Sequence, residues 1–165
     1  MPNWCENTLT LTHEDVGKID ALEAELRSDA PQIFNHLRPN PTGEWQYDWS
    51  VDNWGTKWDA DLQDWDRDGN SITFYGMNTA WGPPIALYDY LTENGWVVEA
   101  MYHEPGMQFC GMYASEDGDD YYEYSFDDFE GTVNEGMPEE LKEWAGLAAS
   151  YQEWLVDRED IENET

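Results

Sequence analysis

The sequence has very little positive charge. Its 165 residues include 7 Lys+Arg against 37 Asp+Glu, which gives a formal net charge of −30. Binding to nucleic acid requires clustered Lys and Arg that replace counterions on phosphates, and docking on anionic membranes requires similar clusters. Scattered basic residues cannot supply either, so the composition argues against direct binding of nucleic acid or of a membrane surface.

Cysteines and long apolar runs are also scarce. Cys5 and Cys110 are the two cysteines, and no run approaches the ~18 consecutive apolar residues of a membrane span. The N-terminal segment has neither the basic region nor the apolar stretch of a secretory signal peptide. We therefore expect a cytoplasmic protein with two free thiols.

The motifs of several catalytic classes are missing as well. The sequence contains no glycine-rich phosphate loop, zinc-type Cys/His cluster or hydrolase nucleophile elbow. Cys5 could pair with one of the three histidines, but a strongly negative chain raises a thiol pKa and disfavours the reactive thiolate. Glu99 and Glu104 could form a glycosidase-like acid pair, yet nothing singles them out among 37 acids. We expect no enzymatic activity and no cofactor.

Aromatic and apolar residues, by contrast, are abundant. Hydrophobic residues make up 40% of the chain and aromatic residues 15%, including 10 Trp and 10 Tyr. Disordered acidic chains are poor in aromatic residues. The chain is therefore expected to fold, as a single domain with a core of its own.

The spacing of apolar residues predicts the secondary structure. Strands are expected where apolar residues alternate or form β-rich runs, and helices where they recur every three or four residues. The predicted strands are 7–12, 62–66, 71–77, 96–104, 107–114 and 121–126, and the predicted helices are 14–27, 82–94 and 138–158. This order indicates an α+β fold, a ferredoxin-like split βαβ sandwich with its helices on one face of the sheet.

Two segments extend this fold. Residues 1–130 are expected to form the domain, with a Trp-rich insertion at 31–60. Residues 131–158 are expected to add an amphipathic C-terminal helix that packs on the domain, although a homodimer seam is the alternative. The apolar stripe of this helix is Leu141, Trp144, Ala148, Tyr151 and Leu155. Residues 159–165 form an acidic tail that is expected to fray.

Several different short motifs are distributed along most of the chain. These motifs are Met1–Asn7, Leu37–Pro41, Trp54–Ala60, Thr79–Pro84, Tyr102–Gly106 and Phe109–Gly111. Together they resemble the YubB ferredoxin-like domain family, over roughly Met1 to Phe126. The resemblance implies a ferredoxin-like fold, a bacterial cytoplasm and an origin in a bacteriophage or conjugative plasmid. It carries no catalytic mechanism, and a shared fold does not transfer function.

An aspartate-rich turn resembles a calcium loop. Asp64, Asp66, Asp68 and Gly69 reproduce the first half of an EF-hand. The twelfth position, however, is Tyr75, where a bidentate Glu is needed, and the flanking residues have strand character. A solvated hairpin turn is favoured, and no metal site is predicted.

The insertion contains the most unusual aromatic pattern and is too irregular in sequence to predict a helix. Its tryptophans are Trp45, Trp49, Trp54 and Trp58. The structural interpretation is a small aromatic core beneath a long loop, because so many indoles must bury most of their surface. The functional interpretation is an interface or a small-ligand or metal site, with the residues Trp54, Lys57, Trp58 and Asp59.

Negative charge is densest in the last third of the chain. Residues 1–113 hold 19 acidic and 5 basic residues, a net charge of −14, and residues 114–165 hold 18 and 2, a net charge of −16. One interpretation of this charge is solubility, or residence in a salty cytoplasm, where acidic surfaces are common. Repulsion of this size costs stability, however, so an acidic surface that folds suggests a function. Because duplex DNA carries one negative charge per about 1.7 Å, thirty charges correspond to roughly fifteen base pairs.

We therefore expect a non-enzymatic protein of a mobile element that binds and inhibits a basic, DNA-binding host protein, as a DNA mimic that counteracts host defence. The alternative is a small-ligand or metal-binding accessory protein that uses the Trp54–Asp59 loop. The carboxylates expected to face the partner are Glu116, Asp117, Asp119, Asp120, Glu123, Asp127, Asp128, Glu130, Glu139, Glu140, Glu143 and Glu153.

Overall fold

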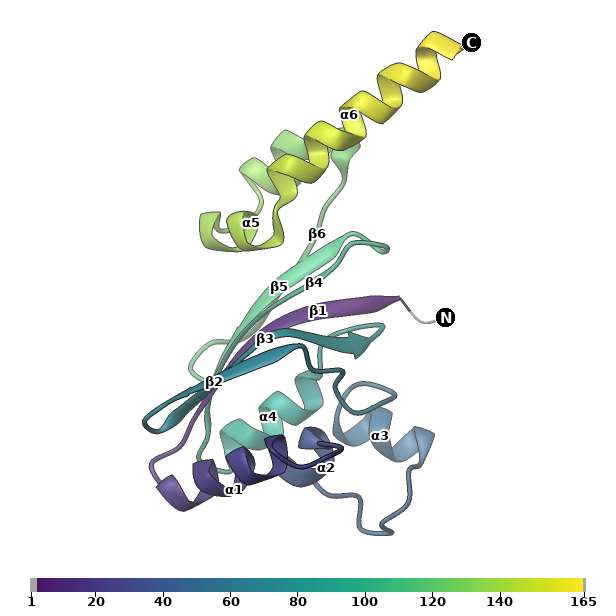
Figure 1. Cartoon of the computed structure of the whole chain (residues 1–165). Helices are drawn as coiled ribbons and strands as arrows, with labels where there is room; N and C mark the ends of the chain where they lie inside the picture. The colour runs from purple at the N-terminus through teal and green to yellow at the C-terminus, as the bar shows by residue number, and fades with distance from the viewer. Residues whose placement is uncertain (1–2, 165) are drawn as a thin grey trace.

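The computed structural model describes residues 3–164 and has the α+β class that the sequence predicts (Figure 1). Its strands are β1 (Trp4–Thr12), β2 (Asp64–Asp68), β3 (Ser71–Ala80), β4 (Val97–Glu104), β5 (Phe109–Ala114) and β6 (Gly118–Glu123). Its helices are α1 (Val16–Leu26), α2 (Ile33–Leu37), α3 (Tyr47–Asn53), α4 (Ile85–Glu93), α5 (Glu139–Ala145) and α6 (Leu147–Glu164), with the short turns η1 (Phe126–Asp128) and η2 (Glu130–Asn134).

All six strands form one antiparallel sheet in the order β2-β3-β1-β4-β5-β6. β1 lies inside the sheet, between β3 and β4, and its alternating sequence gives it one apolar face. Leu9 and Leu11 point to one side and are fully buried, whereas Thr8 and Thr10 point to the other side and are partly exposed. The predicted hairpin of β2 and β3 is confirmed, with Gly69 in its turn.

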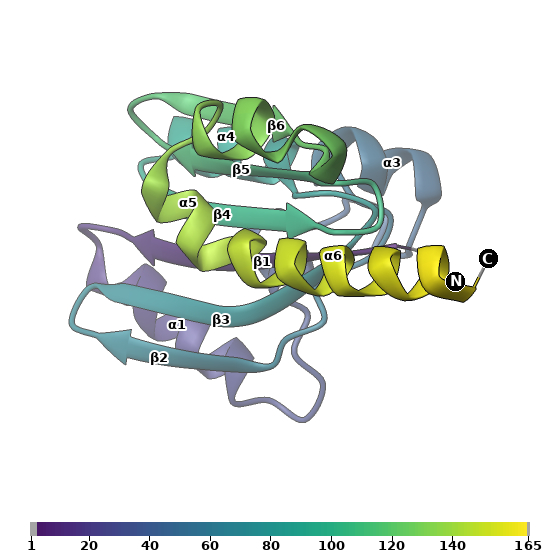
Figure 2. The same cartoon turned by 90° about the horizontal axis from the view of Figure 1, so that it is seen from above.

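The main core fills the space between the sheet and helices α1, α2 and α4, which share one face (Figures 1 and 2). Each helix contributes its apolar stripe to this layer, and each central strand contributes its apolar side. The largest fully buried side chains of the main core include Leu9, Leu11, Ile19, Leu22, Phe34, Phe74 and Tyr88.

A second core lies on the opposite face of the sheet, beneath α5 (Figure 1). It consists of Cys110, Tyr124, Val133, Met137, Leu141 and Leu147. The prediction that helices cover only one face of the sheet is therefore wrong. The second core forms because β5 also has an apolar residue, Cys110, on its outer side, and Leu141 packs in the same cluster.

The insertion contains helices α2 and α3, so the prediction that it lacks helices is wrong. α2 forms because a distant carboxylate caps it: Asp59 accepts hydrogen bonds from the backbone N–H groups of Phe34 (2.9 Å) and Asn35 (3.0 Å). Trp54 is buried, donates from Nε1 to the Arg38 carbonyl at 3.0 Å and contacts Phe34 edge-on. A cap supplied from 25 residues away is invisible to local propensity.

The single C-terminal helix predicted for 138–158 is also wrong, since the chain forms two helices that meet at Gly146. Gly146 adopts a left-handed conformation with φ 66° and terminates α5. α5 packs on the sheet, whereas α6 runs outward and ends far from it (Figure 1). α6 is helical through Glu164, across the tail expected to fray. Thr165 lies outside the described residues.

None of the helices in residues 3–164 has the length and apolar character needed to cross a bilayer.

Candidate functional site

The face of the sheet opposite α1 and α4, which we call the outer sheet face, has a polar floor. Strand register places Thr10 opposite both Thr73 and Glu99. The hydroxyls of Thr10 and Thr73 hydrogen-bond at 3.0 Å, and those of Thr12 and Ser71 at 2.6 Å. Within each pair, the two hydroxyls satisfy each other's hydrogen bonding across β1 and β3. The four residues therefore form a flat, hydroxyl-rich surface with little apolar area.

Carboxylates lie on both sides of this floor. On β2, Asp64, Asp66 and Asp68 are exposed, and they alternate with Trp65 and Arg67, which face the α1 side. Three strand spacings separate the edge strand β2 from the inner strand β4, which carries Glu99, so the aspartates of β2 and Glu99 are about 14 Å apart. That separation is close to the ~12 Å width of the DNA major groove.

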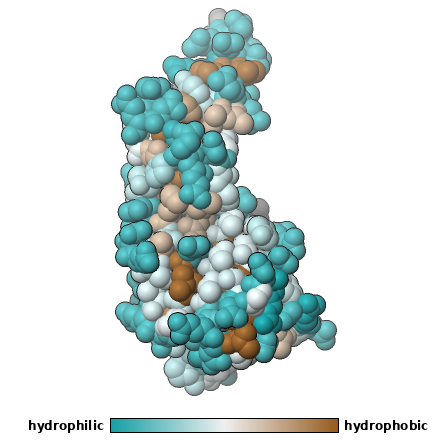
Figure 3. Space-filling view, turned by 90° about the vertical axis from the view of Figure 1, so that its left-hand side faces the viewer, coloured by the Kyte–Doolittle hydropathy of each residue, from teal (hydrophilic) through white to brown (hydrophobic). Residues whose placement is uncertain are grey.

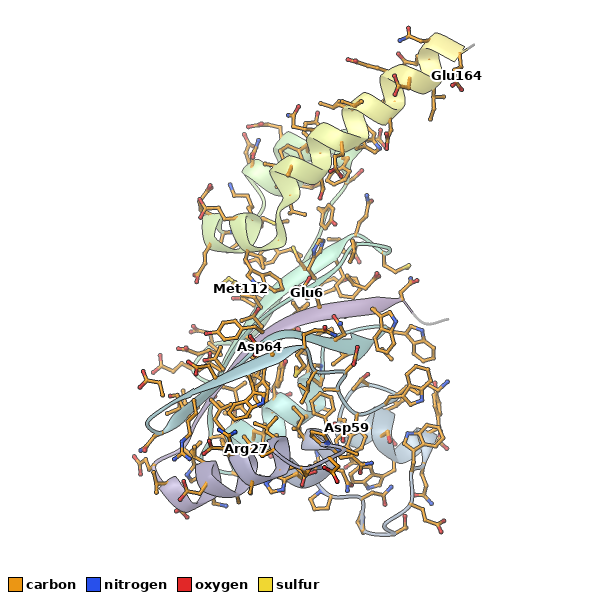
Figure 4. All side chains as sticks on the ribbon, viewed as in Figure 1. Glu6, Arg27, Asp59, Asp64, Met112 and Glu164 are labelled. Carbon is orange, nitrogen blue, oxygen red and sulfur yellow. The ribbon has the colours of Figure 1, made fainter. Side chains whose placement is uncertain are left out.

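A cavity of about 380 Å³ opens between the outer sheet face and α5, and we call it the acidic cavity. Its lining residues are Thr8, Thr10, Glu99, Ala100, Met101, Met112, Tyr113, Ala114, Asp117, Gly118, Asp120 and Glu140. In Figure 4, Met112 lies on the side of the sheet that faces α5. Trp144 of α5 donates from Nε1 to the Thr8 hydroxyl at 3.0 Å and thereby fixes α5 above β1.

The acidic cavity combines four acids with an apolar base. Glu99, Asp117, Asp120 and Glu140 line it, and none of their side chains forms an ion pair or hydrogen bond within residues 3–164. Carboxylates around an apolar base of methionines match an alkylammonium or guanidinium group, whose stem packs on thioethers while its charged head meets carboxylates.

All twelve carboxylates predicted to bind a partner are exposed. The structure brings Asp117, Asp120 and Glu140 together in the acidic cavity. Glu116, Glu143 and Glu153 lie outside that cavity, with no side-chain ion pair or hydrogen bond within residues 3–164.

The other six predicted carboxylates have partners inside the protein. Asp119 is exposed as a residue, but its carboxyl group accepts a 2.6 Å hydrogen bond from the Tyr102 hydroxyl, and the partial burial of this carboxyl raises its pKa. The remaining five also have partners: Glu123 contacts Tyr121, Asp127 contacts Arg158, Asp128 contacts the Gly131 amide, Glu130 contacts Asn134, and Glu139 contacts Lys142. Such acids stabilise their own loops and helices, so less of their charge is available to a partner.

Glu99 is the acid of the cavity that sequence reasoning did not select as a partner residue. The signal was present, because Val98 and Ala100 alternate with Glu99 and Met101 along β4. Glu104 lies on the opposite face from Glu99 and is buried, where it accepts hydrogen bonds from the amides of Gly106 and Met107, both at 2.7 Å. The two acids therefore do not form a glycosidase-like pair.

The structure divides the predicted Trp54–Asp59 loop into two parts. Trp54 and Asp59 serve the fold as described above, whereas Lys57 and Trp58 reach the surface. There they join Trp4 and Trp81, which sequence reasoning missed. The Lys57 Nζ lies 4.6 Å from the Trp58 ring centroid and 5.4 Å from that of Trp81. We call these four residues the tryptophan cluster.

Backbone geometry presents the tryptophan cluster at the surface. Gly55 has φ 88°, and a Cβ there would lie 3.1 Å from the Ile85 and Ala86 nitrogens of α4, so only glycine fits this close approach. Trp81 has φ 70°, which is unusual for a residue with a side chain, and its N–H donates to the Asn3 carbonyl at 2.8 Å. A strained residue with an exposed indole is typical of a functional surface.

Neither thiol has the environment of a nucleophile. Burial raises the pKa of Cys5 to about 12 and that of Cys110 to about 11. Within residues 3–164, no three His, Cys, Asp or Glu side chains gather in a way that could hold a metal ion. Asp64, Asp66 and Asp68 instead lie in a row along one strand.

Comparison of the chain with models of protein families, with curated proteins and with solved structures finds no match.

Proposed function

We propose that the protein binds a basic partner protein through the outer sheet face, and that a Lys or Arg side chain of the partner enters the acidic cavity. The observation that carries the proposal is the set of four unpaired carboxylates around an apolar base in a cavity of about 380 Å³. A cationic side chain would satisfy both the charge and the apolar surface at once.

In the described part of the chain, the ion pairs of the protein's own cations involve acids other than the four of the acidic cavity. Arg67 contacts Asp20 (2.8 Å) and Glu23 (2.6 Å) on the α1 side of the sheet, and Lys142 contacts Glu139 (2.6 Å). Within residues 3–164, no ion pair involves Glu99, Asp117, Asp120 or Glu140. These four acids can therefore attract a positively charged partner, which accelerates encounter at low ionic strength.

α6 extends the acidic surface outward. Glu153, Asp157, Asp160 and Glu164 follow one another at helical spacings of four, three and four residues, so they lie on one face of α6. Figure 3 shows that the side of the molecule it presents is mainly hydrophilic, with small and separate apolar patches. A rigid row of carboxylates on a projecting helix supports the mimicry of a phosphate backbone.

The partner class follows from this mimicry. A surface that imitates the charge of DNA fits the basic groove of a DNA-binding host protein, and occupying that groove would inhibit it. The order β2-β3-β1-β4, with α1 after β1 and α4 after β3, supports a ferredoxin-like split βαβ unit to which β5 and β6 are added. Together with the motifs that resemble the YubB family, this supports an origin in a phage or plasmid that benefits from blocking host defence.

The test uses an oligoarginine peptide as the probe and isothermal titration calorimetry as the measurement. The variant Glu99→Gln/Asp120→Asn/Glu140→Gln should weaken binding about tenfold or more. The matched control, Asp29→Asn/Asp52→Asn/Glu93→Gln, changes the net charge equally but lies outside the cavity, and it should weaken binding far less. Equal losses in the two variants would show that net charge alone binds the peptide and would refute the cavity as the site.

The inhibitory role has its own test. A host DNA-binding protein captured on the wild-type protein should be released by competing duplex DNA and by added salt, because both act on the same basic groove. Capture that persists in excess duplex DNA would refute the mimicry.

The insertion supports a second function, the binding of a small ligand. The observation that favours it is a separate cavity of about 190 Å³ between α2 and α3, whose lining includes Asn35, Trp45 and Asp59.

A further inference from the structure

The tryptophan cluster lies at the end of the sheet where β1 begins and β3 ends, and it lines neither of the two cavities described above. Trp4, Trp58 and Trp81 are 42%, 36% and 48% exposed. The ring centroids of Trp4 and Trp58 are 6.1 Å apart, and Lys57 contacts the rings of both Trp58 and Trp81. Exposed aromatic side chains that gather in one patch, rather than singly, mark interaction sites.

Hydrogen bonds between three segments of the chain fix this cluster before any partner arrives. Thr56 donates from its hydroxyl to the Ala80 carbonyl at 3.0 Å, which ties the loop before Lys57 to the end of β3. The Trp81 N–H donates to the Asn3 carbonyl at 2.8 Å and holds Trp81 at φ 70°, a conformation that costs energy in a residue with a side chain. A surface held this way loses little conformational freedom on binding.

The side chains of the cluster offer hydrogen-bond donors and no acceptors. Three other indoles of the protein donate to an oxygen, but the Nε1 groups of Trp4, Trp58 and Trp81 donate to nothing within residues 3–164. The Lys57 Nζ has neither a hydrogen bond nor an ion pair in the same residues. Indole and ammonium groups can only donate. A complementary ligand therefore combines apolar rings with carbonyl acceptors and carries few N–H or O–H groups of its own.

We infer that the tryptophan cluster binds a proline-rich segment of a partner protein in the polyproline II conformation. Proline lacks a backbone N–H, keeps its carbonyl as an acceptor and presents an apolar ring. Because polyproline II has no internal hydrogen bonds, its carbonyls are available to Lys57 and to the indole N–H groups. Grooves lined by aromatic side chains are the sites at which such segments dock. This surface is separate from the acidic cavity, so the inference goes beyond the function proposed for that cavity.

The dimensions and the charge of the protein support this occupant. The Lys57 Nζ lies 4.6 Å from the ring centroid of Trp58 and 5.4 Å from that of Trp81, so the two centroids are no farther apart than these distances combined. Prolines i and i+3 of a polyproline II helix lie about 9 Å apart on one side, which is within that limit. The net charge of −30 repels the anions that Lys57 would otherwise attract, such as acidic peptides and single-stranded nucleic acid, whereas prolines bring carbonyl dipoles without negative charge.

The test titrates the full chain with octaproline, blocked at both ends, and follows the indole N–H resonances by NMR. The resonances of the cluster are assigned with Trp4→Phe, Trp58→Phe and Trp81→Phe. Octaproline should shift them saturably, with a dissociation constant of about 0.1–1 mM. It should leave the resonance of Trp144, which lies beside the acidic cavity, unchanged.

Three comparison ligands test the assignment. They are a Gly-Ser peptide of equal length, the same peptide with two arginines, and octathymidylate, whose bases could stack on the indoles. All three should shift the resonances of the cluster far less than octaproline does. An equal effect of the arginine peptide would mean that net charge alone attracts the ligand, and a larger effect of octathymidylate would assign the cluster to nucleic acid. Either result, or no shift with octaproline, would overturn the inference.

Two variants separate recognition from stability. Trp81→Gly removes an indole and should weaken octaproline binding about tenfold, yet it should change the melting temperature little, because relief of the positive φ offsets the lost packing. Lys57→Met keeps the apolar stem, removes the donor and should weaken binding several-fold. The control Tyr121→Ala, which removes an exposed aromatic side chain from β6, should leave binding unchanged. Undiminished affinity in both cluster variants, or an equal loss in the control, would show that the cluster does not hold the peptide.

Discussion

The two faces of the sheet are built in different ways. On one face, α1, α2 and α4 enclose a large core, and acids such as Glu23 are paired with Arg27 and Arg67. On the other face, the C-terminal layer (126–164) rests on a much smaller core and contains two of the seven basic residues. The larger core therefore lies on one face of the sheet, whereas the other face has the smaller core and displays the four unpaired carboxylates of the acidic cavity.

The largest expected effect comes from removing a core leucine on each face. Leu22→Ala in the main core and Leu141→Ala in the second core each delete a fully buried side chain, which costs about 2–5 kcal/mol. Leu22→Ala should destabilise the whole domain, whereas Leu141→Ala should release the C-terminal layer and leave the sheet folded. Native-state hydrogen exchange measures the difference residue by residue.

For Leu141→Ala, amides of 126–164 should exchange quickly, while those of β1 and β3 keep their protection. Uniform loss of protection across the sheet would show that the two faces unfold as one unit, and the proposed separation would be wrong.

The regular elements were predictable from the sequence, because they follow from alternation and helical spacing within a short window. β1, α1, the β2–β3 hairpin and α4 all have such local patterns. α2 was not predictable, since it depends on the remote Asp59 cap. The break at Gly146 overrode an apolar stripe that continued through it, as the left-handed glycine let α5 pack on the sheet and α6 leave it.

The candidate site was predictable only in part, for a related reason. Charge density pointed to residues beyond 113, but pairing across strands decides which acids meet. Asp120 faces the acidic cavity, whereas its neighbour Asp119 turns inward to Tyr102. Glu99 joins the cavity from a different strand. The composition of the chain cannot predict how the strands pair.

A second prediction compares acids on the two faces by neutralising them. Removing charge along α6, with Glu153→Gln/Asp157→Asn/Asp160→Asn/Glu164→Gln, eliminates three like-charge pairs at i,i+3 or i,i+4 and should stabilise the helix by about 1 kcal/mol. Melting of α6 followed by circular dichroism in low salt measures the gain, which should shrink in high salt.

Neutralising Glu23 on the other face should have the opposite effect on stability. Hydrogen bonds from Arg67 and Arg27 lower the pKa of Glu23, so its charged form is the stabilising one. Glu23→Gln should therefore lower the melting temperature. If both changes stabilised the protein, the acids of the two faces would be equivalent, contrary to the comparison.

A smaller effect is expected from His103, which hydrogen-bonds to the Tyr124 hydroxyl at 2.8 Å beside the second core. Burial lowers the pKa of His103 below its ordinary 6.5, so the folded state favours the neutral ring. As the pH falls, the unfolded chain therefore binds the proton at a higher pH than the folded chain does. The stability contributed by the neutral ring is complete above about pH 6.5 and is lost as the pH falls below it. His103→Gln should flatten the dependence of the urea midpoint on pH between about 7.5 and 5.5, whereas exposed His36→Gln should not. Equal slopes for the wild type and His103→Gln would contradict the assignment.

The smallest expected effect is a difference between the labelling rates of the two thiols, one on each face of the sheet. Cys110 lies in the second core and Cys5 is buried on the opposite side of the sheet beside Asn7 and Thr79. With pKa values raised to about 11 and about 12, neither thiol should react with Ellman's reagent in native buffer at neutral pH. In low urea, Cys110 should react first, because opening the C-terminal layer exposes it while the sheet stays intact. The variants Cys5→Ala and Cys110→Ala assign the two phases, and labelling of Cys5 before Cys110 would reverse the order of stability that the comparison requires.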